Sequence, residues 1–275
     1  MDKILMVGTK FSHIGNIPML GSSGLKTLNS IIKVMFAKAE QGFAYDPNDL
    51  TTLYQDAAGT IPVTAAGQPV GLMLDKSGRG NHARQTISAS RPLLQRNAIT
   101  SAYYLAFDGA DDFLVTNSIN FAATDKVSLF VGVRKLSTTP GLIVELGNDA
   151  TNNKFFLLNE YRFLARGGVV YTSNQRAEKL VDIVPTDAVV SARGNVQASL
   201  NTIRVNGETG INSTAPLGSG VFINAPVYIG RRAGASLPFN GHLYSLIGIG
   251  RLTTDSETIE LEKVLAKNTG VMLNF

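Results

Sequence analysis

The fold is decided between residues 127 and 172, which read VSLFVGVRKLSTTPGLIVELGNDATNNKFFLLNEYRFLARGGVVYT. Short runs rich in β-branched and aromatic residues alternate there with clusters of Gly, Asn, Pro and Thr, a pattern typical of strands joined by turns. The first run, 127–133, is almost continuously apolar and is therefore expected in the middle of a sheet. The later runs predict a meander of strands at 142–146, 155–158, 162–166 and 169–172.

The same pattern continues on both sides of this stretch. It predicts strands at 104–107 and 113–116 before it, and at 188–192, 202–205, 227–229 and 243–249 after it. The dipeptide Asn206-Gly207 favours the positive φ angles of a type I′ hairpin turn. So many short strands are too many for a small barrel. We therefore predict a mainly β chain that forms a sandwich of two antiparallel sheets.

A helix is predicted at each end of the sandwich. Apolar residues at helical spacing between residues 22 and 39 indicate an amphipathic helix, with Ser22 or Ser23 as its N-cap. Near the other end, Thr254 and Glu257 form a T-x-x-E capping box before a short C-terminal helix. The chain thus divides into an N-terminal arm and helix, residues 1–42, and a sandwich with its C-terminal helix, residues 43–275.

The N-terminal part is predicted to attach the protein to a partner and to form a homo-oligomer, with a trimer as the first guess. The residues assigned to this surface are Leu25, Leu28, Ile32, Met35 and Phe36. The alternative is that the arm and helix pack on the chain's own sandwich, which is the usual role of an amphipathic helix.

Composition excludes several classes of protein. The 275 residues contain no Cys, which excludes disulfides, thiolate metal sites and cysteine nucleophiles. The net charge of +4 is spread without a run of like charges, so no nucleic-acid surface is predicted. No stretch approaches the roughly 20 apolar residues of a membrane span. The N-terminal apolar run is also too short for a secretory signal peptide.

No catalytic centre is predicted, and we expect a protein that is not an enzyme. The sequence contains neither the E-x-D-x-x-E string of some sandwich glycosidases nor a G-x-S-x-G elbow. A phosphate-binding loop is excluded, because Leu20 and Leu25 stand at the two positions before Lys26-Thr27 where that motif requires glycine. The remaining enzymatic alternative is a polysaccharide hydrolase whose carboxylates come from distant strands.

Three groups of segments resemble a known family. They are residues 45–56 with 69–83 and Arg91-Pro92, residues 105–114, and residues 228–232 with 239–244 and the capped helix. In this order they resemble the laminin-G-like, or concanavalin A-like, jelly-roll domains that recur in bacteriophage structural proteins. The resemblance implies a jelly-roll sandwich.

The resemblance also implies a function. It predicts a virion protein of the capsid, tail or fibre, assembled in the host cytoplasm, with residues 1–42 docked on other virion proteins and the jelly roll displayed outward. The alternative is a lectin-like module of a phage fibre, or a free protein, that binds a cell-surface glycan or receptor.

Candidate ligand-binding residues lie in one polar loop and on two tyrosines. Asp75, Ser77, Asn81 and His82 could contact a ligand, or they could fix the loop by hydrogen bonds to neighbouring backbone groups. Tyr45 and Tyr171 are candidate platforms for a sugar ring. The loop and the tyrosines are therefore predicted contacts for a glycan.

Calcium is the one cofactor that the sequence suggests. Asp108, Asp111 and Asp112 place three carboxylates within five residues, and Ca²⁺ prefers such oxygen ligands. Carboxylates in a turn also accept hydrogen bonds from backbone N–H groups without any metal. Both interpretations are open at the level of the sequence.

Overall fold

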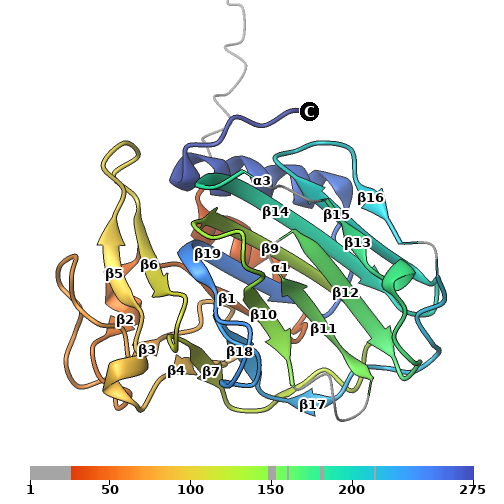
Figure 1. Ribbon diagram of the computed structural model, residues 1–275, viewed down its shortest axis with the longest axis horizontal. Helices are drawn as coiled ribbons and strands as arrows, with labels where there is room; N and C mark the ends of the chain where they lie inside the picture. The colour runs from red at the N-terminus through yellow and green to blue at the C-terminus, as the bar shows by residue number, and fades with distance from the viewer. Residues whose placement is uncertain (1–25, 148–152, 160, 180–182, 214) are drawn as a thin grey trace, which may run out of the picture.

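The protein is a sandwich of two large antiparallel sheets with a layer of helices on one side (Figure 1). The computed structural model describes residues 26–147, 153–159, 161–179, 183–213 and 215–275. The predicted mainly β class, the two sheets and the two helices are all confirmed. Neither of these helices has the length and hydropathy that crossing a membrane requires.

The first sheet has eight strands in the order β16-β15-β14-β9-β19-β6-β5, with β1 beside β19. Its centre is formed by three strands of ten residues each, β9, β14 and β19. Strand β9 pairs with β14 along its whole length, which confirms the central position predicted for residues 127–133. The bounds are β1 Gly42–Tyr45, β5 Leu93–Arg96, β6 Tyr103–Asp108, β9 Lys126–Lys135, β14 Thr186–Asn195, β15 Leu200–Val205, β16 Ile211–Asn212 and β19 Asn240–Ile249.

The second sheet has nine strands in the order β13-β12-β11-β10-β18-β7-β4-β3-β2. Their bounds are β2 Leu53–Tyr54, β3 Leu72–Met73, β4 Ala83–Arg84, β7 Leu114–Thr116, β10 Leu142–Leu146, β11 Lys154–Asn159, β12 Arg162–Gly167, β13 Ala177–Glu178 and β18 Val227–Ile229. A separate pair joins β8, Ile119–Asn120, to β17, Asn224–Ala225. Three short 3-10 helices, η1 Leu50–Thr52, η2 Ser88–Ser90 and η3 Ser173–Gln175, lie in the connections.

One predicted strand of the meander is wrong. Residues 169–172 run as a loop into η3, because Thr172 caps that short helix and Gln175 returns a hydrogen bond to the backbone of Thr172. The local capping interaction outweighs the β-propensity of the sequence VVYT.

The core between the sheets follows from the alternation of side chains along each strand. On β11 and β12, Phe156, Leu158 and Phe163 are buried between the sheets, whereas Leu157 and Leu164 belong to a separate cluster on the outer face. Edge-to-face contacts, with ring centroids 5.2 and 5.5 Å apart, join Phe156 to Phe121 and Phe222. The second sheet therefore carries apolar residues on both of its faces.

The helices cover the outer face of the first sheet. Helix α1, Leu28–Met35, and helix α3, Asp255–Thr269, form a cluster with apolar residues of β1, β9, β14 and β19. Helix α1 begins later than expected, since Thr27 accepts the capping hydrogen bond from Ser30 N, 3.2 Å away. Helix α3 has the predicted capping box, in which Thr254 Oγ1 accepts from Glu257 N and Glu257 Oε2 accepts from Thr254 N.

The apolar face of α1 packs on the chain's own sandwich, the second of the two alternatives above. Leu28, Ile32, Met35 and Phe36 are each 7% exposed or less, and they contact the sheet and α3. These side chains are buried within the chain itself. They therefore do not form the exposed docking surface that the attachment hypothesis assigned to them. Leu25, the fifth residue of that face, lies outside the described residues.

Candidate functional site

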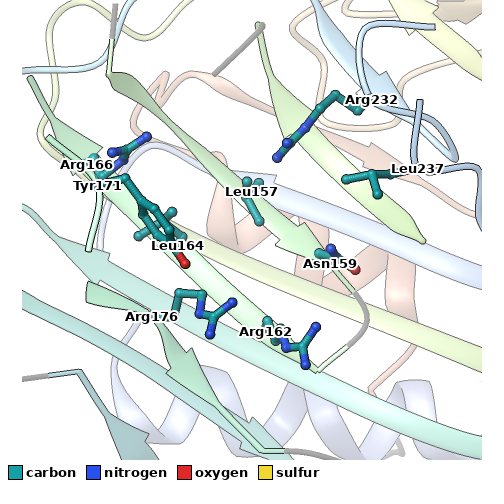
Figure 2. A pocket seen from close by; sticks show the side chains of 9 residues that line it. All are labelled: Leu157, Asn159, Arg162, Leu164, Arg166, Tyr171, Arg176, Arg232 and Leu237. Carbon is teal, nitrogen blue, oxygen red and sulfur yellow. The ribbon is translucent and has the colours of Figure 1, made fainter. Parts of the chain in front are cut away.

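A cavity opens on the outer face of the second sheet, on the side of the sandwich opposite to α1 and α3. Its volume is about 250 Å³. We call it the arginine pocket; its lining residues are Leu157, Asn159, Arg162, Leu164, Arg166, Tyr171, Arg176, Arg232 and Leu237 (Figure 2). The period of two along a strand explains why Arg162, Leu164 and Arg166 of β12 all reach this face.

The floor of the pocket is apolar and its rim is polar. Leu157 and Leu164 belong to a small buried cluster, against which Leu237 packs. Figure 2 shows the arginines and Asn159 arranged around Leu157 and Leu164. Small-molecule sites usually combine an apolar lining with a few hydrogen-bonding groups.

Tyr171 lies at the rim beside a buried cation. The guanidinium carbon of Arg166 is 5.2 Å from the ring centroid of Tyr171 and 4.8 Å from that of Phe155. Arg166 is 3% exposed, whereas Tyr171 is 43% exposed. The cation–π contact therefore holds a tyrosine ring in place while much of its surface faces solvent.

The segment that carries Tyr171 is fixed by one buried amide. Gln175 Nε2 donates to Val170 O at 3.2 Å and to Pro216 O at 2.8 Å, and Gln175 is 2% exposed. Asn201, on β15 of the other sheet, donates through Nδ2 to Gln175 O at 2.8 Å. Because Gln175 is buried and makes all three of these hydrogen bonds, the loop is anchored even though it is not a strand.

Two carboxylates pair with arginines of the pocket. Glu178 Oε1 lies 3.1 Å from Arg162 Nε, and its Oε2 lies 3.2 Å from Arg176 Nη2. Glu145, which is fully buried, lies 3.2 Å from Arg232 Nε. Glu178 is thus shared by two guanidinium groups, so its single negative charge balances only one of them.

The predicted loop contacts at residues 75–82 form an internal hydrogen-bond network. Asp75 Oδ1 accepts from Ala44 N at 2.9 Å and from Ser77 N at 2.8 Å. Asp75 Oδ2 accepts from Ser77 Oγ at 2.6 Å and from Asn81 N at 3.0 Å. Asp75 therefore fastens this loop to β1. This agrees with the interpretation that these residues fix the loop by hydrogen bonds to neighbouring backbone groups.

His82 and Tyr45 complete the same network. His82 Nδ1 accepts from Asp75 N at 3.0 Å, and burial together with the nearby Arg84 lowers the pKa of His82. The Tyr45 hydroxyl donates to Asn81 O, and burial raises the pKa of Tyr45 well above its usual value. Tyr45 is fully buried and cannot act as a sugar platform. None of these residues lines the arginine pocket.

The calcium interpretation of the aspartate turn is not supported by the geometry. Asp108 Oδ1 accepts from Ala110 N and Asp111 N, Asp112 Oδ2 accepts from Asp108 N, and Asp111 Oδ2 accepts from Ser90 Oγ. Among the described residues, no group of three or more metal-ligating side chains converges on one point. Asp108 and Asp112 instead close the turn, and Asp111 joins it to Ser90 of η2.

Tyr171 is therefore the one predicted site residue that the structure places in the pocket. The arginines were missed, although the sequence RFLAR at residues 162–166 contains a usable signal. Alternation predicts that Arg162, Leu164 and Arg166 share one face. What the sequence did not reveal is that this face is free of the helices that cover the other sheet.

Comparisons with known proteins establish the fold class. No family model matches the chain, and no curated protein matches its sequence. A solved GH54 α-L-arabinofuranosidase soaked with a cyclic sulfate inhibitor superposes with a TM-score of 0.55 at 13% identity, over 87% of this chain and 65% of that one. A botulinum neurotoxin type C whose cell entry depends on two ganglioside molecules gives 0.53 at 12% identity, over 82% and 51%.

The chain spans about half to two thirds of the length of those structures, and at such low identity the likeness shows the fold alone. The laminin-G and bacteriophage parts of the resemblance stay predictions. By its topology and its structural neighbours, the protein is a jelly-roll-like β-sandwich.

Proposed function

We propose that the protein is a carbohydrate-binding module that holds a glycan in the arginine pocket. The observation that carries this proposal is the combination, in one cavity, of the solvent-facing Tyr171 ring, an apolar floor and a rim of hydrogen-bond donors. A sugar presents C–H groups on its ring faces and hydroxyls at its edge, and it needs these two kinds of contact at once.

The size of the pocket limits what it accepts. Ligand sites usually have volumes of roughly 300–1,000 Å³. The arginine pocket, at about 250 Å³, lies just below that range. It suits one sugar ring of a chain, with the neighbouring rings left outside.

We also propose that the site binds without cleaving. Glycoside hydrolysis needs a carboxylic acid and a second carboxylate on either side of the bond that breaks. Of the carboxylates described around the pocket, Glu145 is fully buried against Arg232, and Glu178 lies between two arginines. Neither is presented to a ligand as an acid or a nucleophile.

The fold is compatible with this role, since an arabinofuranosidase and a neurotoxin whose cell entry depends on gangliosides share it. A shared fold does not assign a function, and the argument rests on the pocket. The virion role and virion location stay predictions from the family resemblance. Mass spectrometry of purified particles tests them, and finding the chain there would place the glycan-binding module on a phage.

The test of glycan binding is a glycan array followed by calorimetry on the full chain. We expect Tyr171→Ala to weaken binding about twofold to tenfold, because a specific contact of one aromatic ring contributes about 0.5–1.5 kcal/mol. Val170→Ala is the matched control, because Val170 is the adjacent residue and is 77% exposed. Equal affinities for the two variants would place the site elsewhere. Release of reducing ends from a bound glycan would overturn the non-enzymatic part.

A further inference from the structure

We propose that the arginine pocket selects a sugar that carries a carboxylate over a neutral sugar of the same size. This inference rests on the proposed function, because it names the class of glycan that the pocket takes. The residues that make the choice are Arg162 and Arg176, and the feature that enables them to do so is the carboxylate they share.

The charges around Glu178 are unequal. Glu178 lies between Arg162 Nε at 3.1 Å and Arg176 Nη2 at 3.2 Å, so two positive charges face one negative charge. Counted over the residues that the structure describes, this end of the pocket keeps an excess positive charge. A ligand carboxylate would complete two matched pairs, whereas a neutral hydroxyl would leave the excess in place.

Both arginines are accessible to a ligand. The side chains of Arg162 and Arg176 are 27% and 31% exposed, so both can be reached from solvent although each is largely enclosed by protein. Charge–charge attraction is stronger at such partly enclosed positions than in bulk water. A guanidinium group also offers a planar fork of N–H donors that matches the two oxygens of a carboxylate.

These two arginines differ from the other two. Arg166 is 3% exposed and stacks on Phe155 and Tyr171, so it positions the ring that we assign to the sugar face. Arg232 is paired with the buried Glu145. The pocket thus has a ring-binding part, Tyr171 and the leucines of the floor, and a charge-reading part, Arg162 and Arg176 with Glu178.

The test measures affinities of the full chain for pairs of sugars that differ in charge. The pairs are trigalacturonate against its methyl ester and sialyllactose against lactose, each in low salt and in 0.5 M salt. We expect the acidic member of at least one pair to bind at least tenfold more tightly than its neutral counterpart. High salt should reduce this preference.

Two variants test the assignment with opposite signs. Arg176→Gln leaves Arg162 and Glu178 as a balanced pair, and it should cut the preference for the acidic sugar at least tenfold. Glu178→Gln frees both arginines and should increase the preference. The matched control is Arg193→Gln on the first sheet, since Arg193 is 27% exposed and also pairs with one carboxylate, Asp255.

The outcomes separate the two proposals. Equal affinity for the acidic and neutral members overturns the charge selection but leaves glycan binding intact. A preference that persists unchanged in Arg176→Gln and Glu178→Gln, each checked for folding by thermal melting, shows that other residues read the charge. Absence of binding to every glycan on the array overturns the proposed function itself.

Discussion

At the scale of single residues, Asp112 shows what the aspartate turn costs. Its side chain is buried, and Oδ2 accepts a hydrogen bond from Asp108 N at 3.1 Å. Burial, followed by the negative charge of Asp108, raises the pKa of Asp112 to about 6. Because the folded-state pKa is raised, the contribution of this carboxyl to stability is present at low pH and is lost as the pH rises through about 6.

The first prediction follows from that sign. Asp112→Asn keeps an acceptor for Asp108 N and removes the charge, so it should stabilise the fold above pH 7 by about 1 kcal/mol, after allowance for screening by solvent. The advantage should vanish near pH 4. Urea unfolding of the two proteins at pH 4, 6 and 8 measures it. A difference in stability that does not depend on pH would show that Asp112 does not titrate in this range.

At the scale of elements, helix α3 is attached to the first sheet by one buried carboxylate. Glu262, which is 1% exposed, accepts from Ser191 Oγ at 2.5 Å and from Arg204 Nε at 3.0 Å. The pair with Glu262 raises the pKa of Arg204. A buried carboxylate of this kind holds the helix in one position on β14 and β15. Apolar contacts alone are less directional and allow the helix to shift more easily.

The second prediction concerns this attachment. Glu262→Gln removes the negative charge and leaves Arg204 partly buried without its partner, which typically costs about 3 kcal/mol. Urea unfolding followed by circular dichroism measures the loss. A loss below about 0.5 kcal/mol is the value of an exposed ion pair, and it would show that Arg204 finds solvent instead.

Elements also show how far the sequence predicts the structure. Strands β10 and β18 have the predicted bounds, and Asn206 and Gly207 have the predicted positive φ angles of 53° and 78°. These features are local, since they depend on side-chain type and on the preferences of one turn. Residues 169–172 failed because Thr172 and Gln175 form a cap that competes with the strand.

The pocket was harder to predict for a different reason. Tyr171 was a candidate. Of the arginines that line the pocket with it, Arg166 lies on β12 and Arg176 follows η3. Their meeting depends on pairing between strands, and on which face of the sheet the helices leave open. Strand pairing and the choice of the open face depend on contacts between residues far apart in the sequence, so local sequence patterns do not predict them.

At the scale of the whole molecule, the N-terminal helix belongs to the sandwich. Helix α1 shares one buried apolar cluster with α3 and with Ala44, Phe130, Val189 and Ile247 of the first sheet. Arg251 strengthens the contact, since it pairs with Glu40 at 3.2 Å and donates to Met35 O at 3.2 Å. The boundary placed after residue 42 therefore crosses a continuous apolar cluster.

The third prediction reverses an expectation based on that boundary. Independent domains would leave a chain that begins at Phe43 fully stable. Removal of α1 instead exposes an apolar surface, and each buried apolar side chain contributes about 1.5–3 kcal/mol. We expect this shortened chain to melt at a lower temperature and to aggregate, as measured by calorimetry and light scattering. Unchanged melting and a monomeric state would show that α1 is dispensable.

Helices α1 and α3 lie on the side of the sandwich opposite to the arginine pocket. A group attached to the helices therefore does not obstruct the pocket. A tether joined to the helical side holds the sandwich while its other side stays clear for a large polymer. Biotin placed on Lys263 or Lys267 of α3 and captured on a sensor therefore presents every copy with its pocket turned toward the solution.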